Sequence, residues 1–312
     1  MNEAETKAYK AVRSVPHKKL EVTGREALLH AIELRFKRQA KARAERKARL
    51  EPAFKAIRAA VAKSPDLAAL RGPIAKAMQA SAGQYKHPRT SARSPKSPFV
   101  KLGSLQLVDV PPFQSLTGFN QNGIVTMQGP AANGKTGSMS FNLQAGGPNS
   151  SGTSGAGTVD CWAAVGQAYT LPASVYKVYK ASLTFTVSPS VSWEAIWGSS
   201  WWREAAGSIW IGQVVNEFTP DGALVSTPVS TQHFLESFDD NNFSDSGNQN
   251  GSSSGIPLSS TLMIESDMLY ECWAVVGGSA TGDFSDSQSF AQVSIQATAN
   301  PLTFDWRWRG PG

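Results

Sequence analysis

Short stretches in which apolar and polar residues alternate constrain the fold of this chain more than any other feature of its sequence. The clearest stretch, residues 191–212, contains five of the nine tryptophans. Apolar residues occupy every second position from Val191 to Trp197, and again at Ile209 and Ile211. A period of two is typical of strands that bury one face. The stretch therefore predicts two half-buried strands joined by a loop.

Residues 101–312 repeat this pattern about ten times, with turn residues between the stretches. Such a series without a convincing helix predicts an antiparallel β-sandwich or jelly roll. Residues 239–255 are rich in Asp, Asn, Ser and Gly, so we expect a long polar loop there. The predicted strands are residues 123–128, 137–144, 159–165, 180–187, 191–197, 208–217, 224–227, 258–265, 269–276, 290–298 and 302–306.

The loop between the two strands of residues 191–212 contains adjacent indoles, which cannot both enter one core. We expect it to form an exposed rim that binds a partner surface or a glycan, because aromatic rings stack on such ligands. The predicted ligand-binding residues are Trp197, Trp201, Trp202 and Arg203. Glu194 and Glu204 flank the loop, and a pair of carboxylates is also what glycoside hydrolysis requires. A glycoside hydrolase is therefore the third hypothesis, after two non-enzymatic ones.

A literal phosphate-loop motif, G-x-x-x-x-G-K-T, occupies residues 129–136. Such a loop needs a helix after it, so that backbone N–H groups point at the phosphate. Residues 137–143 alternate instead, and Asn133-Gly134 is a preferred hairpin turn. The motif therefore predicts a β-hairpin, and we expect no nucleotide cofactor.

Charge divides the chain into a basic and an acidic part. Residues 1–100 contain 23 Lys and Arg against 8 Asp and Glu, whereas residues 101–312 contain 7 against 16. A capping box at Thr23 and Glu26 predicts a helix from there to about Leu50, with Pro52 stopping or kinking it. Shorter helices are expected after Pro52 and after Ser64.

The basic residues concentrate in residues 35–49, which have almost no apolar face. We expect this segment either to bind an anionic partner, such as nucleic acid without sequence preference, or to dock on the acidic body. The predicted anion-binding residues are Arg35, Lys37, Arg38, Lys41, Arg43, Arg46, Lys47 and Arg49. The predicted organisation is a basic helical arm (1–80), a basic Pro/Ser-rich linker (81–100) and a β-sandwich domain (101–312).

Cysteine and histidine usage offers little for metal or redox chemistry. The two cysteines, Cys161 and Cys272, lie in strands of matching pattern, which allows either a cross-strand contact or two free buried thiols. His233 is the one histidine among the strands. Oxygen-bearing residues in 239–245 do not follow the spacing of a calcium loop. We predict no metal site and no cofactor.

Several segments resemble uncharacterised bacterial β-sandwich proteins. The likeness is carried by residues 209–212, 217–218, 221–222 and 251–258, by Tyr270 and Trp273, and by the hairpin at residues 135–137. It covers about half of the chain and implies a sandwich fold without a known activity.

The layout of basic arm, linker and stranded body also resembles the coat proteins of small RNA viruses. Residues 176–180, leading to Leu183, Phe185 and Ser188-Pro189, are similar to the entry of their shell domain. This resemblance implies that the arm neutralises packaged RNA.

These observations favour a non-enzymatic binding or assembly protein, with self-association expected and a virus-type coat protein as the alternative. No apolar run reaches the roughly 18 residues that span a bilayer, and the first residues lack the apolar core of a secretory signal. We therefore expect synthesis in the cytoplasm, with assembly into a larger particle as one outcome.

Overall fold

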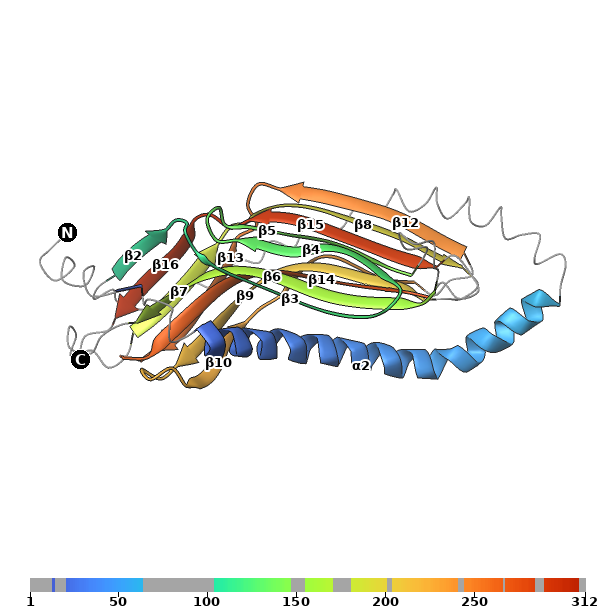
Figure 1. Ribbon diagram of the computed structural model, residues 1–312, viewed down its shortest axis with the longest axis horizontal. Coiled ribbons are helices and arrows are strands. Elements are labelled where there is room, and N and C mark those ends of the chain that lie inside the picture. The colour runs from blue at the N-terminus through green and yellow to red at the C-terminus, as the bar shows by residue number, and fades with distance from the viewer. Residues whose placement is uncertain are drawn as a thin grey trace, which may run out of the picture.

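The computed structural model describes residues 13–14, 21–63, 104–146, 155–170, 181–200, 204–240, 244–265, 267–283 and 289–308. These residues form three antiparallel sheets and one long helix, α2 (Glu21–Ala62). The prediction of a mainly-β sandwich is confirmed. Figure 1 shows the sheets in layers, with α2 running along the outside of one of them.

The first sheet, sheet A, has the order β1-β6-β14-β9-β10, with β3 also pairing with β6 and β11 also pairing with β9. Its strands β6, β14 and β9 have fourteen residues each and pair along their whole length. The bounds are β1 (Arg13–Ser14), β3 (Gln114–Gly123), β6 (Gly157–Thr170), β9 (Ala205–Phe218), β10 (Leu224–Ser230), β11 (His233–Asp240) and β14 (Leu269–Gly282).

Two further sheets pack on one face of sheet A. Sheet C has the order β12-β8-β15-β5-β4, and sheet B has the order β13-β7-β16-β2. The bounds are β2 (Ser104–Asp109), β4 (Val125–Asn133), β5 (Ser138–Ala145), β7 (Ala181–Val187), β8 (Ser190–Ser200), β12 (Ser244–Ser253), β13 (Leu258–Ile264), β15 (Phe290–Thr298) and β16 (Leu302–Trp308).

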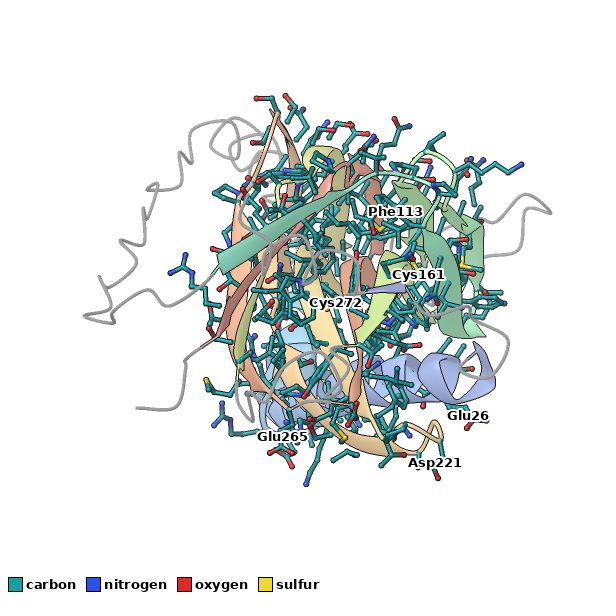
Figure 2. All side chains as sticks on the ribbon, turned by 90° about the vertical axis from the view of Figure 1, so that its left-hand side faces the viewer. Glu26, Phe113, Cys161, Asp221, Glu265 and Cys272 are labelled. Atoms are coloured by element: carbon teal, nitrogen blue, oxygen red, sulfur yellow. The ribbon has the colours of Figure 1, made fainter. Side chains whose placement is uncertain are left out.

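The main core lies between sheet A and the other two sheets. Alternate residues of β5 and β7 are buried, as a period of two requires. Aromatic rings join sheet A to sheet B: the Tyr169 ring lies 4.2 Å from that of Phe304, which stacks on Phe185 at 5.1 Å. Seen along the long axis, side chains fill the space between the sheets (Figure 2).

The central strands of sheet A are buried on both faces, which corrects the expectation that residues 208–217 form a half-buried strand. Ile209 and Ile211 point into the main core, whereas Trp210 and Val214 belong to a second cluster on the opposite face. Residues of α2 complete that second cluster. Alternation fails as a guide here because a helix covers the face that would otherwise meet water.

The expected polar loop at residues 239–255 is wrong, because most of it forms β12, which pairs with β8 over ten consecutive residues. Its inward positions include Gly247 and Gly251, which lie opposite Trp197 and Trp193 of β8. Its outward positions are polar, with Asn248 and Asn250 exposed. The strand therefore contributes no apolar side chain of its own, and the indoles of β8 supply the buried surface.

The phosphate-loop motif forms the predicted hairpin, between β4 and β5. The N–H of Gly137 donates to Asn133 O at 2.9 Å, and the N–H of Lys135 donates to Asn133 Oδ1. The left-handed residue of the turn is Gly137, at a φ of 73°, rather than Gly134. Gly134 is needed for space, because a Cβ there would overlap the backbone of Phe113.

Helix α2 differs from the prediction at both ends. It begins at Glu21, before the expected cap at Thr23, and it continues through Pro52 to Ala62. Pro52 does not end the helix, although the helix bends in its C-terminal part (Figure 1). The expected helix after Ser64 and the linker at residues 81–100 lie outside the described residues.

Cys161 and Cys272 are both free and buried in the main core. They lie on neighbouring strands, but Cys161 pairs with Gly278 and Cys272 with Gln167. Six residues of strand separate the two positions, about 20 Å. A cross-strand contact between the thiols is therefore excluded, and free thiols are confirmed.

Candidate functional site

The first four turns of α2 anchor the basic arm to sheet A. Ala27, Leu28 and Ile32 are buried against the sheet, at 3%, 0% and 0% exposure. The ring of Phe36 lies 6.4 Å from that of Trp210. Leu28, Ile32 and Phe36 follow the i, i+4, i+8 spacing that places side chains on one face of a helix, and Ala27 lies beside them. The arm is therefore docked by apolar packing rather than by charge alone.

Three tryptophans on three neighbouring strands form the surface on which α2 rests. Trp162, Trp210 and Trp273 are buried in one cluster with Leu28 and Ile32. Each indole lies over a glycine directly opposite on the next strand: Gly118, Gly277 and Gly166, respectively. The glycines let the large rings lie flat, so that the helix can approach the sheet.

Beyond Phe36 the same helix exposes its basic residues. Lys37 and Lys41 form exposed pairs with Glu33 and Glu45, at 3.7 and 3.9 Å, and such pairs contribute little stability. Arg46 pairs with Asp239 of β11, which ties the basic segment to the acidic body at one point. The predicted residues with exposed side chains are Lys37, Arg38, Lys41, Arg46 and Arg49. Arg35, Arg43 and Lys47 belong to the same helix, but their side chains lie outside the described residues.

The predicted tryptophan rim is only partly described. Trp201, Trp202 and Arg203 lie outside the described residues. Trp197 is 9% exposed and stacks on Phe238 of β11 at 4.5 Å. It therefore belongs to the core and is not available to a ligand.

Of the two carboxylates suggested for glycoside hydrolysis, Glu194 lies within a strand of sheet C and Glu204 lies just before a strand of sheet A. Glu194 is in the middle of β8, six residues before the strand ends at Ser200, whereas Glu204 precedes β9. Six residues of strand span about 20 Å. A catalytic pair requires a separation of roughly 5–9.5 Å, and no contact among the described residues brings Glu194 and Glu204 together, so the glycoside hydrolase stays a prediction.

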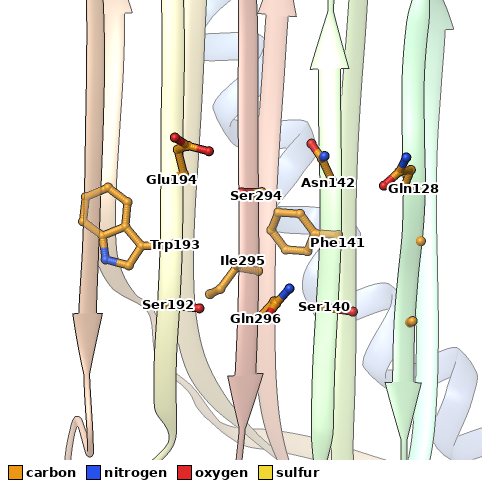
Figure 3. Close-up of a pocket in the computed structure, with 12 residues that line it drawn as sticks. Gln128, Ser140, Phe141, Asn142, Ser192, Trp193, Glu194, Ser294, Ile295 and Gln296 are labelled. Atoms are coloured by element: carbon orange, nitrogen blue, oxygen red, sulfur yellow. The ribbon is translucent and has the colours of Figure 1, made fainter.

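Sequence reasoning missed a polar face on the outside of sheet C. Polar side chains, mostly amides and hydroxyls, face each other in register across the strands, as in the row Glu194, Ser294, Asn142 and Gln128 (Figure 3). A hollow of about 560 Å³ opens over this row and the next one. The next row contains Ser192, Gln296 and Ser140. The alternation of these residues with the core positions was the signal that could have located the face.

The polar face carries almost no charge. The five strands of sheet C contain no Lys or Arg, and their acidic residues are Glu194 and Asp245. Amides and hydroxyls both donate and accept hydrogen bonds. Such a surface is suited to a neutral, hydroxyl-rich ligand rather than to an ion.

Glu271 is a buried carboxyl next to Trp273, one of the three tryptophans on which α2 rests. It is 1% exposed, and Trp273 Nε1 donates to its Oε2 at 3.3 Å. Burial raises the pKa of Glu271 to about 7, and polar contacts with Trp273 and Asn216 oppose that rise. Because the carboxyl is buried, its protonation changes the stability of the fold.

Among the described residues, no cluster of three His, Cys, Asp or Glu side chains could hold a metal ion. Helix α2 contains no stretch that is both long enough and apolar enough to cross a membrane, and no other helix is present among the described residues.

Comparisons with known proteins give no family assignment. No family model matches the chain, and no curated protein matches it. Two solved structures show weak similarity. One is the enzymatically active domain of tailspike protein 4 of bacteriophage CBA120 (13% identity, TM-score 0.16, 59% of this chain and 19% of that chain). The other is infectious bursal disease virus, Gx strain (11% identity, TM-score 0.14, 70% and 44%). The chain spans less than half of either, and TM-scores this low do not define a shared fold.

Proposed function

We propose that the protein is a non-enzymatic binding or assembly module whose α2 arm engages a polyanion, with nucleic acid as the favoured class. The observation that supports the proposal is that α2 has two parts, an apolar part that is docked on sheet A and a basic part that is exposed. Its first turns are buried on sheet A, while Lys37, Arg38, Lys41, Arg46 and Arg49 stay exposed.

Because the apolar part fixes α2 on the sheet, the basic part presents its charges at a fixed spacing. Lys and Arg that neutralise phosphates release counterions, which drives binding without base recognition. Among its described side chains, the exposed part of α2 offers no aromatic platform on which bases could stack in the manner of single-strand binding proteins. We therefore expect affinity for single-stranded and duplex nucleic acid alike, with weak sequence preference.

The test uses full-length protein freed of bound nucleic acid, and a short labelled oligonucleotide of mixed sequence. The variant Arg38→Gln/Arg49→Gln removes two exposed arm charges, and Gln keeps helix propensity close to that of Arg. We expect affinity to fall about tenfold or more at moderate salt. The matched control, Lys135→Gln/Arg307→Gln, removes two charges from the body and should bind nearly as tightly as the unaltered protein.

An equal loss of oligonucleotide affinity in the arm variant and the body variant would show that net charge, and not the arm, determines binding. Failure of the unaltered protein to bind any nucleic acid at low salt would contradict the proposal outright.

A second candidate function is glycan binding, favoured by the hollow over sheet C, whose lining is rich in amides and hydroxyls and contains one carboxylate, Glu194. Neutral oligosaccharides titrated calorimetrically against the unaltered protein and Asn142→Ala/Gln296→Ala would test it. The double variant should lose binding, because both amides line the hollow. A heat of binding that is identical in both proteins, or absent in both, would exclude the outer face of sheet C as a glycan-binding site.

The coat-protein alternative predicts the same arm chemistry and adds a shell. Light scattering separates the two: a coat protein forms large particles of uniform size, whereas a binding module stays small. The resemblance to bacterial β-sandwich proteins stays a prediction.

A further inference from the structure

The two edges of sheet C differ sharply in how well they are protected against pairing with another chain. Strand β4 forms one edge, and its pairing with β5 is interrupted between Gln128 and Ala131. The interruption contains Pro130, which has no N–H to donate. Bulges and prolines are the usual devices that protect an edge strand.

Strand β12, at the other edge, has none of these devices. Its ten residues pair with β8 in unbroken register, and they include no Pro, Lys or Arg. Among the described residues, no strand pairs with its far side. Figure 1 shows β12 along the outer margin of the sandwich. Its one charged residue is Asp245, next to the start of the strand. A long, regular edge that is neutral from Ser246 to Ser253 is a template for a further strand.

The strand is also held rigid. The indoles of Trp193 and Trp197 lie over Gly251 and Gly247, and a Cβ on Gly251 would come within 2.8 Å of Trp193. These contacts fix β12 flat against β8. Because the edge is preformed, little conformational entropy is lost when another strand adds to it.

Other edges in the described residues are shorter, irregular or covered. Strands β10 and β11 show register shifts against β9. Strand β3 lies beside β4. Strand β13 is bound by Gln213 of sheet A, whose Nε2 donates to Leu258 O at 3.3 Å. Strand β2 has six residues. This leaves β12 as the long open edge.

We propose that β12 pairs with β12 of a second copy, antiparallel and about a two-fold axis, to form a continuous sheet across a dimer. A second copy is the favoured occupant because an antiparallel pair of identical strands is self-complementary. The outward side chains Asn248, Asn250 and Ser252 are neutral, so like charges do not oppose each other. The opposite edge is protected, so growth stops at two copies and no fibre forms.

The inference does not depend on the arm, and its test removes nucleic acid first by nuclease and high salt. Molar mass is then measured by light scattering over a range of protein concentrations. The variant Asn248→Lys/Asn250→Lys places like charges across the two-fold axis. The matched control Thr126→Lys/Gln128→Lys places the same charges on exposed positions of β4.

We expect the unaltered protein and the β4 control to be dimers, and the β12 variant to be a monomer with the same circular dichroism spectrum. A monomeric unaltered protein, a dimer that persists in the β12 variant, or an open-ended assembly would overturn the proposal.

A second measurement covers the outcome in which the charged variant fails to fold. Both native thiols are buried, so Asn248→Cys introduces the one reactive thiol among the described residues. A short bismaleimide should join two copies of this variant, and it should leave Thr126→Cys uncrosslinked. Equal crosslinking of the two variants would contradict pairing through β12.

Discussion

The indole of Trp210 lies across Gly277 of the neighbouring strand, so closely that a Cβ on Gly277 would overlap the six-membered ring. The two residues are directly opposite in the register of β9 and β14. The same arrangement occurs for Trp162 with Gly118 and for Trp273 with Gly166. Paired indoles and glycines therefore build the surface on which the arm docks.

Replacing Gly277 with Ala should destabilise the protein by about 3 kcal/mol, because overpacking a filled core forces rings or backbone to move. Urea denaturation followed by circular dichroism measures the change. The control is Gly255→Ala, where the nearest atom to a new Cβ lies at 3.8 Å. That variant should be neutral or slightly more stable, since alanine restricts the unfolded chain. Equal stability of the two variants would contradict the close packing of Trp210 on Gly277.

Ile32→Ala should weaken the docking of α2 on sheet A, because Ile32 is fully buried in the cluster that contains Trp162, Trp210 and Trp273. The expected cost is about 2–4 kcal/mol, concentrated in the docking of α2. Hydrogen exchange of the α2 amides should accelerate, and the fluorescence of the buried indoles should shift to the red. Leu34→Ala is the matched control, because Leu34 is 40% exposed and its truncation should change little. Unchanged exchange in Ile32→Ala would show that α2 does not rest on this cluster.

Stability should fall as pH rises through the range of about 4.5 to 7. The folded state raises the pKa of Glu271 from 4.5 to about 7, so the folded protein binds the proton more tightly than the unfolded chain does. The favourable contribution is complete below pH 4.5 and lost above 7, and it amounts to at most roughly 3 kcal/mol. Glu271→Gln should remove this dependence. Parallel unfolding curves of the variant and the unaltered protein at pH 5 and pH 8 give the comparison, and identical pH dependence would contradict it.

The two cysteines should be inert in the native protein. Burial raises the pKa of Cys161 and of Cys272, and the neighbouring Asp160 and Glu271 raise them further. A thiol reagent at pH 8 should therefore label neither residue until a denaturant is added, and then both. Rapid labelling of the native protein would show that the core between the sheets is open.

The alternating pattern was sufficient for strands that bury one face in the main core. It predicted residues 290–298, which are the bounds of β15. It also identified the hairpin at residues 129–136, although these residues match the phosphate-loop motif, because the alternation after Thr136 is unambiguous.

The pattern failed where a partner element determines burial. Strand β12 has a sequence of Ser, Asp, Asn, Gln and Gly, which favours turns, and it becomes a strand because Trp193 and Trp197 cover its glycines. The second buried face of β9 could not be read locally, since it depends on α2. The polar hollow depends on register across strands, which no single stretch of sequence specifies.

The claim that the arm engages a polyanion is tested most directly by the salt dependence of oligonucleotide binding. For a single-stranded ligand, the slope of log K against log salt should shrink by about 0.7 for each phosphate contact removed, so by about 1.4 in Arg38→Gln/Arg49→Gln. The control Lys135→Gln/Arg307→Gln should keep the slope of the unaltered protein. A slope that is unchanged in the arm variant would contradict the account.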